Sequence, residues 1–235
     1  TSVSGFLSPD LIQPCIDKGI KERKREDLVK KGFRHHFISV MDPAFRHDDF
    51  VYGIFHKEED GTVVQDLLRV WSPNKKAGIK LNPNEILDEI SNLNKQWNIQ
   101  VSYSDQAQLE SLQQLALIKG FSIIGNDFTK KSKPKMYGSL KHLFRTKKIK
   151  ILDDLRVYQQ LVRLQQKNTP NGGTQIFVPA PGHDDICSVL ALGAECAIQL
   201  TPTKIMEVPK ETDWDKCIID MKRKRRLVEA GWGSF

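Results

Sequence analysis

The chain has 235 residues, of which 39% are hydrophobic and 28% are charged, as is usual for globular proteins. No stretch has the roughly 18 consecutive apolar residues that cross a bilayer, and the polar N-terminus lacks the apolar core of a signal peptide, so we expect a soluble cytoplasmic protein. The formal net charge of +7 favours a polyanionic partner such as a nucleic acid.

The first half of the chain predicts an antiparallel meander. Residues 1–32 are polar and basic, and we expect a partly helical lead-in there. The run 35–42 is apolar on both faces, which is typical of a central strand. The runs 51–56 and 62–71 are separated by a turn signal, so they predict two further strands paired antiparallel with the first.

Strand and helix patterns then alternate, which predicts parallel strands joined by right-handed crossovers. A helix begins near Pro83, and the remaining expected elements are a strand over 99–105, a helix over 108–119, a strand over 121–125, an exposed basic loop over 129–135, a helix over 136–146, a short edge strand over 149–151, a helix over 153–166, a strand over 174–178 and a helix over 183–199. Beyond Thr201 the periodicity fades into a basic tail.

Four aspartates stand where these apolar elements end or begin. Asp42 ends the strand 35–42, Asp105 ends the strand 99–105, and the pair Asp184-Asp185 opens the last helix beside His183. Each position also has a structural explanation, either as a turn before a proline or as a helix cap. Together, however, two strand ends and a helix start can meet at one edge of an α/β sheet, where ligand sites usually lie.

Carboxylates gathered at such an edge repel one another unless cations lie between them. Two divalent ions roughly 4 Å apart would activate a water and stabilise the leaving oxygen in phosphodiester hydrolysis. Because oxygen ligands suit Mg²⁺ or Mn²⁺, we expect two such ions and no zinc. The expected metal ligands are Asp42, Asp105, Asp184 and Asp185, with His183 orienting a water or a phosphate.

The order of these elements resembles the RNase H-like nuclease fold. The segments Val40-Met41-Asp42-Pro43, Tyr103-Ser104-Asp105 and Gly182-His183-Asp184-Asp185 are similar to motifs of the C-terminal nuclease domain of the large terminase subunit of tailed bacteriophages, as are 135–144 and 148–151. The resemblance covers about residues 33–200. It implies an α/β fold whose mixed central sheet, a three-strand antiparallel meander plus parallel strands, is flanked by helices. Residues 1–32 would then link to an ATPase domain, and 201–235 would be a C-terminal tail.

The resemblance also implies a function and its residues. The family cleaves double-stranded viral DNA during genome packaging, so Asp42 would bridge both metals, Asp105 would hold one, and Asp185 would be the late ligand, supported by Asp184 and His183. The chain has no GxxxxGK[ST] phosphate loop, so the ATPase motor would lie upstream of it. The portal and the small terminase subunit are the expected protein partners, in the cytoplasm of the infected bacterial host and transiently at the procapsid portal.

Basic clusters flank the acidic segments, and we expect phosphate contacts from Lys131, Lys133, Lys147 and Lys148. DNA binding should therefore weaken as the salt concentration rises. Two alternatives remain open at this point. One is another nuclease of the same fold, of the junction-resolvase or integrase type, and the other is a non-catalytic DNA-binding or assembly module whose aspartates are helix caps.

Overall fold

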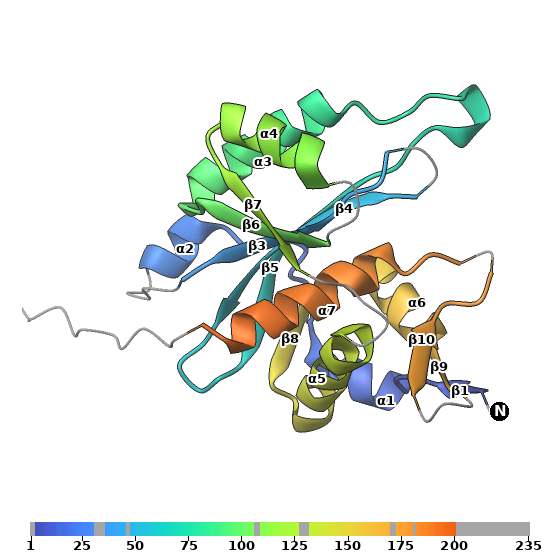
Figure 1. The fold of residues 1–235 in the computed structure, drawn as a ribbon. Coiled ribbons are helices and arrows are strands. Elements are labelled where there is room, and N and C mark those ends of the chain that lie inside the picture. Colours follow the sequence, from blue (N-terminus) through green and yellow to red (C-terminus); the bar gives the residue numbers. More distant parts are fainter. Residues whose placement is uncertain are drawn as a thin grey trace, which may run out of the picture. The chain divides into compact units, whose positions relative to one another are not determined.

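A seven-stranded mixed sheet forms the centre of the fold (Figure 1). The computed structural model describes residues 3–30, 36–45, 48–105, 109–126, 132–169, 173–180 and 182–200. The predicted meander is confirmed as β3 (Ile38–Asp42), β4 (Phe50–Lys57) and β5 (Val63–Trp71). On one side of it, β6 (Val101–Asp105) and β7 (Ser122–Asn126) continue the sheet in parallel with β3. The expected α/β class with a mixed central sheet is therefore correct.

The other side of the sheet uses the N-terminal segment. β8 (Ile149–Leu152) pairs in parallel with β5, and β2 (Ile16–Asp17) pairs in parallel with β8, giving the order β2-β8-β5-β4-β3-β6-β7. β8 was predicted to be an edge strand, which is wrong, because β2 pairs with its outer side. A strand four residues long with apolar residues at alternate positions looks the same at an edge and inside a sheet.

The segment expected as a lead-in contributes further elements to the same fold. β1 (Val3–Gly5) joins β9 (Gln165–Asn168) and β10 (Thr174–Phe177) in a small antiparallel sheet. α1 (Pro9–Ile12) and a 3₁₀ turn (Gln13–Cys15) follow, and the helix α2 (Arg25–Lys30) comes after β2. Four apolar side chains of this segment are buried in the main core, which differs from the expectation of a polar linker: Phe6, Leu7, Ile12 and Cys15.

Helices cover both faces of the large sheet (Figure 1). α3 (Pro83–Trp97) and α4 (Leu109–Ile118) pack on one face, and a 3₁₀ turn (Lys75–Ala77) precedes α3. α5 (Ser132–Thr146), α6 (Leu155–Arg163) and α7 (Asp185–Ile198) pack on the other. The two cores follow from strand alternation, since Val40 lies in the core under α7 and its neighbour Met41 lies in the core under α3.

α7 lies very close to the meander because each side of the contact has a glycine, one in α7 and one in β4. A β-carbon at Gly193 of α7 would lie 2.3 Å from the Phe55 ring of β4, and one at Gly53 would lie 2.8 Å from the same ring. The absence of both side chains lets the ring fill the space between helix and sheet. This contact fixes the helix across β4, and its first turn lies beside the loop between β3 and β4.

Two helix boundaries differ from those predicted. α5 begins at Ser132, inside the segment 129–135 that we expected to be a loop. α6 ends at Arg163, and the chain continues as β9, where the helix had been predicted to run to residue 166. The polar sequence of β9 carries no alternating apolar pattern, so only its pairing with β1 and β10 identifies it as a strand. Within the described ranges, no helix is both long and apolar enough to cross a membrane.

Candidate active site

Asp42 lies at the end of β3 on the face that α7 covers. Ile38 and Val40, which share its parity along the strand, are both buried in the core beneath that helix. The backbone of Asp42 is paired with Val51 near the start of β4. The side chain is partly buried, which suits a group at the rim of the core.

Asp105 ends the neighbouring parallel strand at the same edge of the sheet. Met41 of β3 is paired with Ser104 of β6, so Asp42 and Asp105 are the next residues along two adjacent strands. The side chain of Asp105 lies outside the described part of the structure. So do residues 106–108, and the alternative explanation of Asp105 as a cap of the helix that follows therefore stays a prediction.

The two aspartates at the start of α7 have different partners. A side-chain oxygen of Asp184 lies 2.9 Å from Nζ of Lys133, which is in the first turn of α5. A side-chain oxygen of Asp185 accepts a hydrogen bond from the backbone N–H of Asp49, at 3.2 Å. One carboxylate therefore faces α5, and the other faces the loop between β3 and β4.

His183 also contacts that loop. Its Nδ1 lies 3.0 Å from a side-chain oxygen of Asp48, and both side chains are about half exposed, at 43% and 52%. The start of α7 is thus joined to the β3–β4 loop by two adjacent contacts, one from His183 and one from Asp185. An imidazole held by a carboxylate at one nitrogen can present its other nitrogen to solvent.

The electrostatics of the site are those of an acidic cluster. Burial raises the pKa of Asp185 to about 6, and the negative charges of Asp48 and Asp184 act in the same direction. Burial also raises the pKa of the Tyr137 phenol well above its ordinary value, and the charges of Asp184 and Asp42 add to that increase. Asp42 and Asp184 therefore lie within electrostatic reach of the same buried phenol.

The first turn of α7 is capped from outside. Asp184 occupies the N-cap position, but its side chain makes no capping hydrogen bond. The side-chain oxygen of Gln160, from α6, instead accepts hydrogen bonds from the N–H groups of Ile186 and Cys187, at 3.0 and 3.3 Å. Helix capping, the structural explanation considered for this pair of aspartates, is therefore not what Asp184 does.

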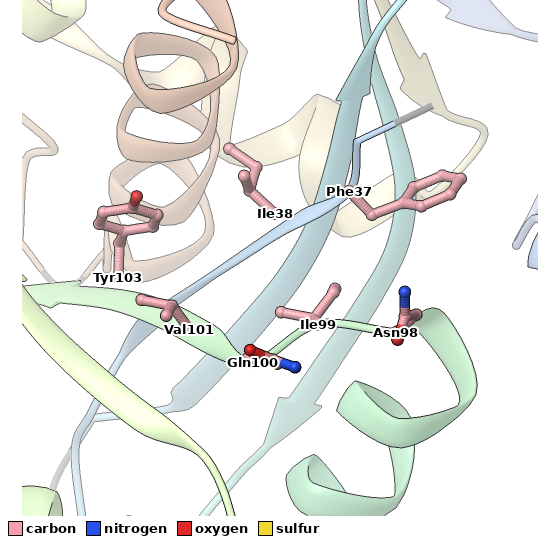
Figure 2. Close-up of a pocket in the computed structure, with 7 residues that line it drawn as sticks. All are labelled: Phe37, Ile38, Asn98, Ile99, Gln100, Val101 and Tyr103. Atoms are coloured by element: carbon pink, nitrogen blue, oxygen red, sulfur yellow. The ribbon is translucent and has the colours of Figure 1, made fainter. Parts of the chain in front are cut away.

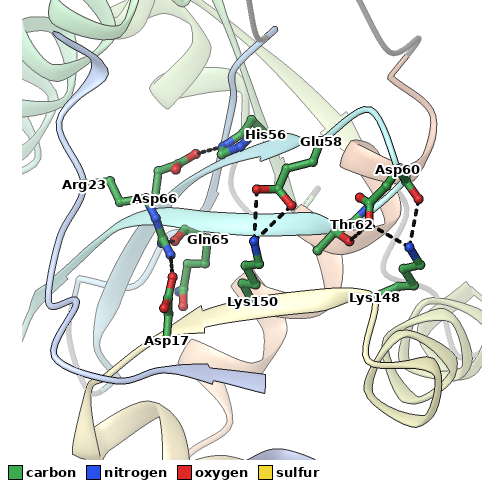
Figure 3. Close-up of polar contacts among 10 residues, drawn as sticks. All are labelled: Asp17, Arg23, His56, Glu58, Asp60, Thr62, Gln65, Asp66, Lys148 and Lys150. Atoms are coloured by element: carbon green, nitrogen blue, oxygen red, sulfur yellow. Dashed lines mark hydrogen bonds and ion pairs between the residues drawn. The ribbon is translucent and has the colours of Figure 1, made fainter. Parts of the chain in front are cut away.

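The lysines expected to contact DNA do not form one surface. Lys133 lies at the acidic edge of the sheet, whereas Lys148 pairs with Asp60 in the turn between β4 and β5, at 2.8 Å (Figure 3). That turn is at the opposite end of the meander, because β4 runs away from Asp42. Lys147 precedes Lys148 and has a left-handed backbone at the end of α5, with φ of 55°. Lys131 lies outside the described residues.

A surface cavity of about 290 Å³ also lies away from the aspartates (Figure 2). Phe37, Ile38 and the segment 98–101 line it together with Tyr103. Most of these residues lie at or just before the beginning of β3 and β6, and Tyr103 is in the middle of β6, whereas Asp42 and Asp105 are at the end of the same strands. The cavity is therefore separate from the candidate site.

Three contributors to the site were missed by sequence reasoning. Asp48 and Asp49 form a second adjacent acidic pair, directly before an apolar strand, and this pattern could have drawn attention to them. Gln160 is an ordinary helix residue, and no local pattern distinguishes it from its neighbour Gln159. Its role depends on the packing of α6 against α7.

No protein-family model matches the chain, and no curated protein matches its sequence. Its structure is similar to that of the large terminase of bacteriophage HK97, with a TM-score of 0.67 and 14% identity over 83% of this chain and 44% of that one. It is also similar to the large terminase nuclease of thermophilic phage G20c with bound magnesium, with a TM-score of 0.64 and 15% identity over 83% and 98% of the two chains.

A third similar structure is the large terminase nuclease domain of Thermus phage P74-26, with a TM-score of 0.60 and 16% identity over 79% of this chain and 88% of that one. The chain spans less than half of the HK97 large terminase but nearly all of the G20c nuclease. The chain therefore has the RNase H-like fold of the nuclease domains of phage large terminases.

Proposed function

We propose that the chain is a metal-dependent endonuclease domain that cleaves double-stranded DNA during viral genome packaging. The single observation that carries this proposal is the meeting of the β3 end, bearing Asp42, with the start of α7, bearing Asp184 and Asp185, on a fold otherwise found in phage large terminase nucleases. The G20c nuclease has been crystallised with magnesium, cobalt and zinc, which supports a divalent cation as the cofactor.

The donor chemistry of the site fits such a cation. Asp185 has a raised pKa because it is partly buried beside other carboxylates, and a divalent cation would offset that repulsion. Among the described side chains, no three acidic, histidine or cysteine groups lie close enough together to hold an ion, so the proposed ligand set of Asp42, Asp185 and Asp105 needs the last residue to be complete.

Two Mg²⁺ or Mn²⁺ ions, when bound, would activate the attacking water and stabilise the leaving oxygen. The chain's own residues would do the rest. Asp42 would lie at the centre of the ligand set, while Asp184 supports it from the Lys133 side. His183, held by Asp48, would orient the water or a phosphate. Among the described lysines that are expected to contact DNA, Lys133 lies at this edge, and we propose that it faces a phosphate of the bound duplex.

The proposed domain would act within a larger protein. An upstream ATPase domain of that protein would drive DNA packaging. The portal and the small terminase subunit would be the partners of the whole protein, in the cytoplasm of the infected host. In this proposal Lys147 and Lys148 would contact DNA only beyond the cleavage site, because they lie at the opposite end of the meander. Residues 201–235 lie outside the described residues, so the expected C-terminal tail stays a prediction.

The test is nicking of supercoiled plasmid DNA with Mg²⁺ or Mn²⁺. Asp42→Asn and Asp105→Asn should each reduce the nicking rate by at least about 100-fold, because each removes a charged ligand. Asp60→Asn is the matched control, an exposed aspartate at the far end of the meander, and it should keep the wild-type rate. Undiminished cleavage by both site variants would rule out the assignment.

A further inference from the structure

The N–H groups that Gln160 binds are those an N-cap aspartate normally takes. With Asp184 as the N-cap residue of α7, Ile186 and Cys187 are the second and third helical residues. A side chain at the N-cap accepts its hydrogen bond from one of these two positions. Gln160 occupies both, so Asp184 has no capping partner left and its carboxylate lies against Lys133 instead.

Gln160 is itself held firmly in position. Val157 and Leu161 of the same helix are both fully buried and lie three residues before and one residue after it. The helix α6 has its own N-cap, because the side chain of Asp154 accepts a hydrogen bond from the N–H of Arg156 at 2.8 Å. The carboxamide is therefore presented to α7 from a capped helix that is packed into the core. It is also a neutral acceptor, so it satisfies the helix end without adding charge to the acidic cluster.

We propose that Gln160 is a positioning residue for the acidic site, a substitute cap that keeps Asp184 off the helix end and against Lys133. This inference rests on the proposed function, because it concerns how the aspartates are presented to a cation. Without the carboxamide, two unsatisfied N–H groups would lie within reach of the Asp184 carboxylate. The positive end of the helix would attract that carboxylate, and its contact with Lys133 would be lost.

The first test needs no metal. We compare crystal structures of the metal-free wild-type protein and of Gln160→Met, and apart from the substituted residue they should differ in the position of the Asp184 side chain. In the variant, the Asp184 carboxylate should leave Lys133 and bind the N–H of Ile186 or Cys187. If Asp184 stays against Lys133 in the variant, the inference is wrong, whatever the protein does with DNA.

The second test is Mn²⁺ binding measured by calorimetry. Gln160→Met should weaken binding by about 10-fold, as is usual when a residue that orients a ligand is lost. Gln159→Met, an exposed neighbour on the same helix, should bind as the wild type does. Gln160→Glu keeps an acceptor of the same length and should bind at least as tightly as the wild type, because its added charge also favours a cation.

These outcomes separate two failures. Wild-type protein that binds no Mn²⁺ would count against the proposed function, while the crystal comparison would still decide the position of Asp184. Unchanged affinity in Gln160→Met would overturn the positioning role, even if the variant unfolds at a lower temperature. Equal loss in Gln160→Met and Gln159→Met, or in Gln160→Met and Gln160→Glu, would overturn it as well.

Discussion

Carboxylates in this chain differ widely in their surroundings, and their partners decide what each can do. Asp184 is paired with a lysine, and Asp185 accepts a backbone N–H. Asp66 is fully buried in β5, where one of its oxygens lies 2.6 Å from Nδ1 of His56 (Figure 3) and the other has no hydrogen-bond partner among the described residues. Asp66 is also the extra residue of a β-bulge, because Ile54 is paired with Leu67 and the next residue of β4 with Gln65.

Asp66→Asn is expected to change how stability depends on pH. Burial raises the pKa of Asp66, so the folded state holds this proton more tightly than the unfolded state does. The contribution of the carboxyl to stability is therefore fully present below its unfolded pKa of about 3.9 and is lost as the pH rises through the folded pKa. In urea unfolding between pH 4 and pH 8, the variant should gain stability relative to wild type as the pH rises.

Asp60→Asn is expected to have the opposite effect on stability, in a more acidic pH range. The hydrogen bond from Lys148 lowers the pKa of Asp60, so its contribution is present at neutral pH and is lost on acidification. That loss occurs below the unfolded pKa of about 3.9, so it is measured by urea unfolding between about pH 2 and pH 5, where this variant should lose stability relative to wild type as the pH rises. Parallel pH profiles for the two variants would contradict both assignments.

At the scale of elements, the contact between α7 and β4 places the site. The helix lies close to β4 because Gly193 and Gly53 have no side chains and leave space for the Phe55 ring. This close packing brings the first turn of the helix to the end of β3. The sequence pattern predicted the helix. It did not indicate which strand the helix crosses, because that depends on the order of strands in the sheet.

Gly193→Ala should therefore destabilise the protein by about 1–3 kcal/mol, because the added methyl group would overlap the Phe55 ring. Gly138→Ala is the matched control, since a β-carbon there meets nothing within 4 Å on the exposed side of α5. It should stabilise the protein by roughly 0.5–1 kcal/mol through helix propensity. Urea unfolding of both variants measures the difference, and equal effects would contradict close packing at Gly193.

At the scale of the whole molecule, the N-terminal segment is part of the fold. Residues 1–203 form one compact unit, and β2 with the buried side chains that precede it completes the sheet and the core. The boundary expected at residue 32 came from the polar composition of the segment. Its apolar residues nevertheless include the adjacent pairs Phe6-Leu7, Leu11-Ile12 and Cys15-Ile16, and four of these six side chains are buried in the main core.

Ile12→Ala tests this integration. Ile12 is fully buried, so its truncation should lower the free energy of unfolding by about 2–5 kcal/mol while leaving a single cooperative transition. Val3→Ala, at an exposed position of β1, should change it by less than about 0.5 kcal/mol. A linker that folds separately would instead give two transitions, or no loss of stability in Ile12→Ala.

Much of the architecture could be predicted because the pattern of apolar residues within a short stretch indicates a strand or a helix. Apolar runs and the turn signal between two of them predicted β3, β4 and β5, and helical spacing predicted α3 and α7. Asp42 and Asp105 could be placed at one edge because parallel neighbours end at the same edge. The strands β1 and β2 could not be predicted, because their pairing partners lie more than 130 residues away in the sequence. β9 could not be predicted because its polar sequence has no alternating apolar residues, although one of its partners, β10, is close in the chain.

The sequence by itself determined the alternation of strands and helices and the positions of the aspartates along them, because both follow from side-chain periodicity over a few residues. Only the tertiary structure decided which groups those aspartates meet. Lys133, Asp49 and Gln160 are brought to the start of α7 from three other elements. Such contacts between distant segments depend on how helices and strands pack, and no local pattern carries that information.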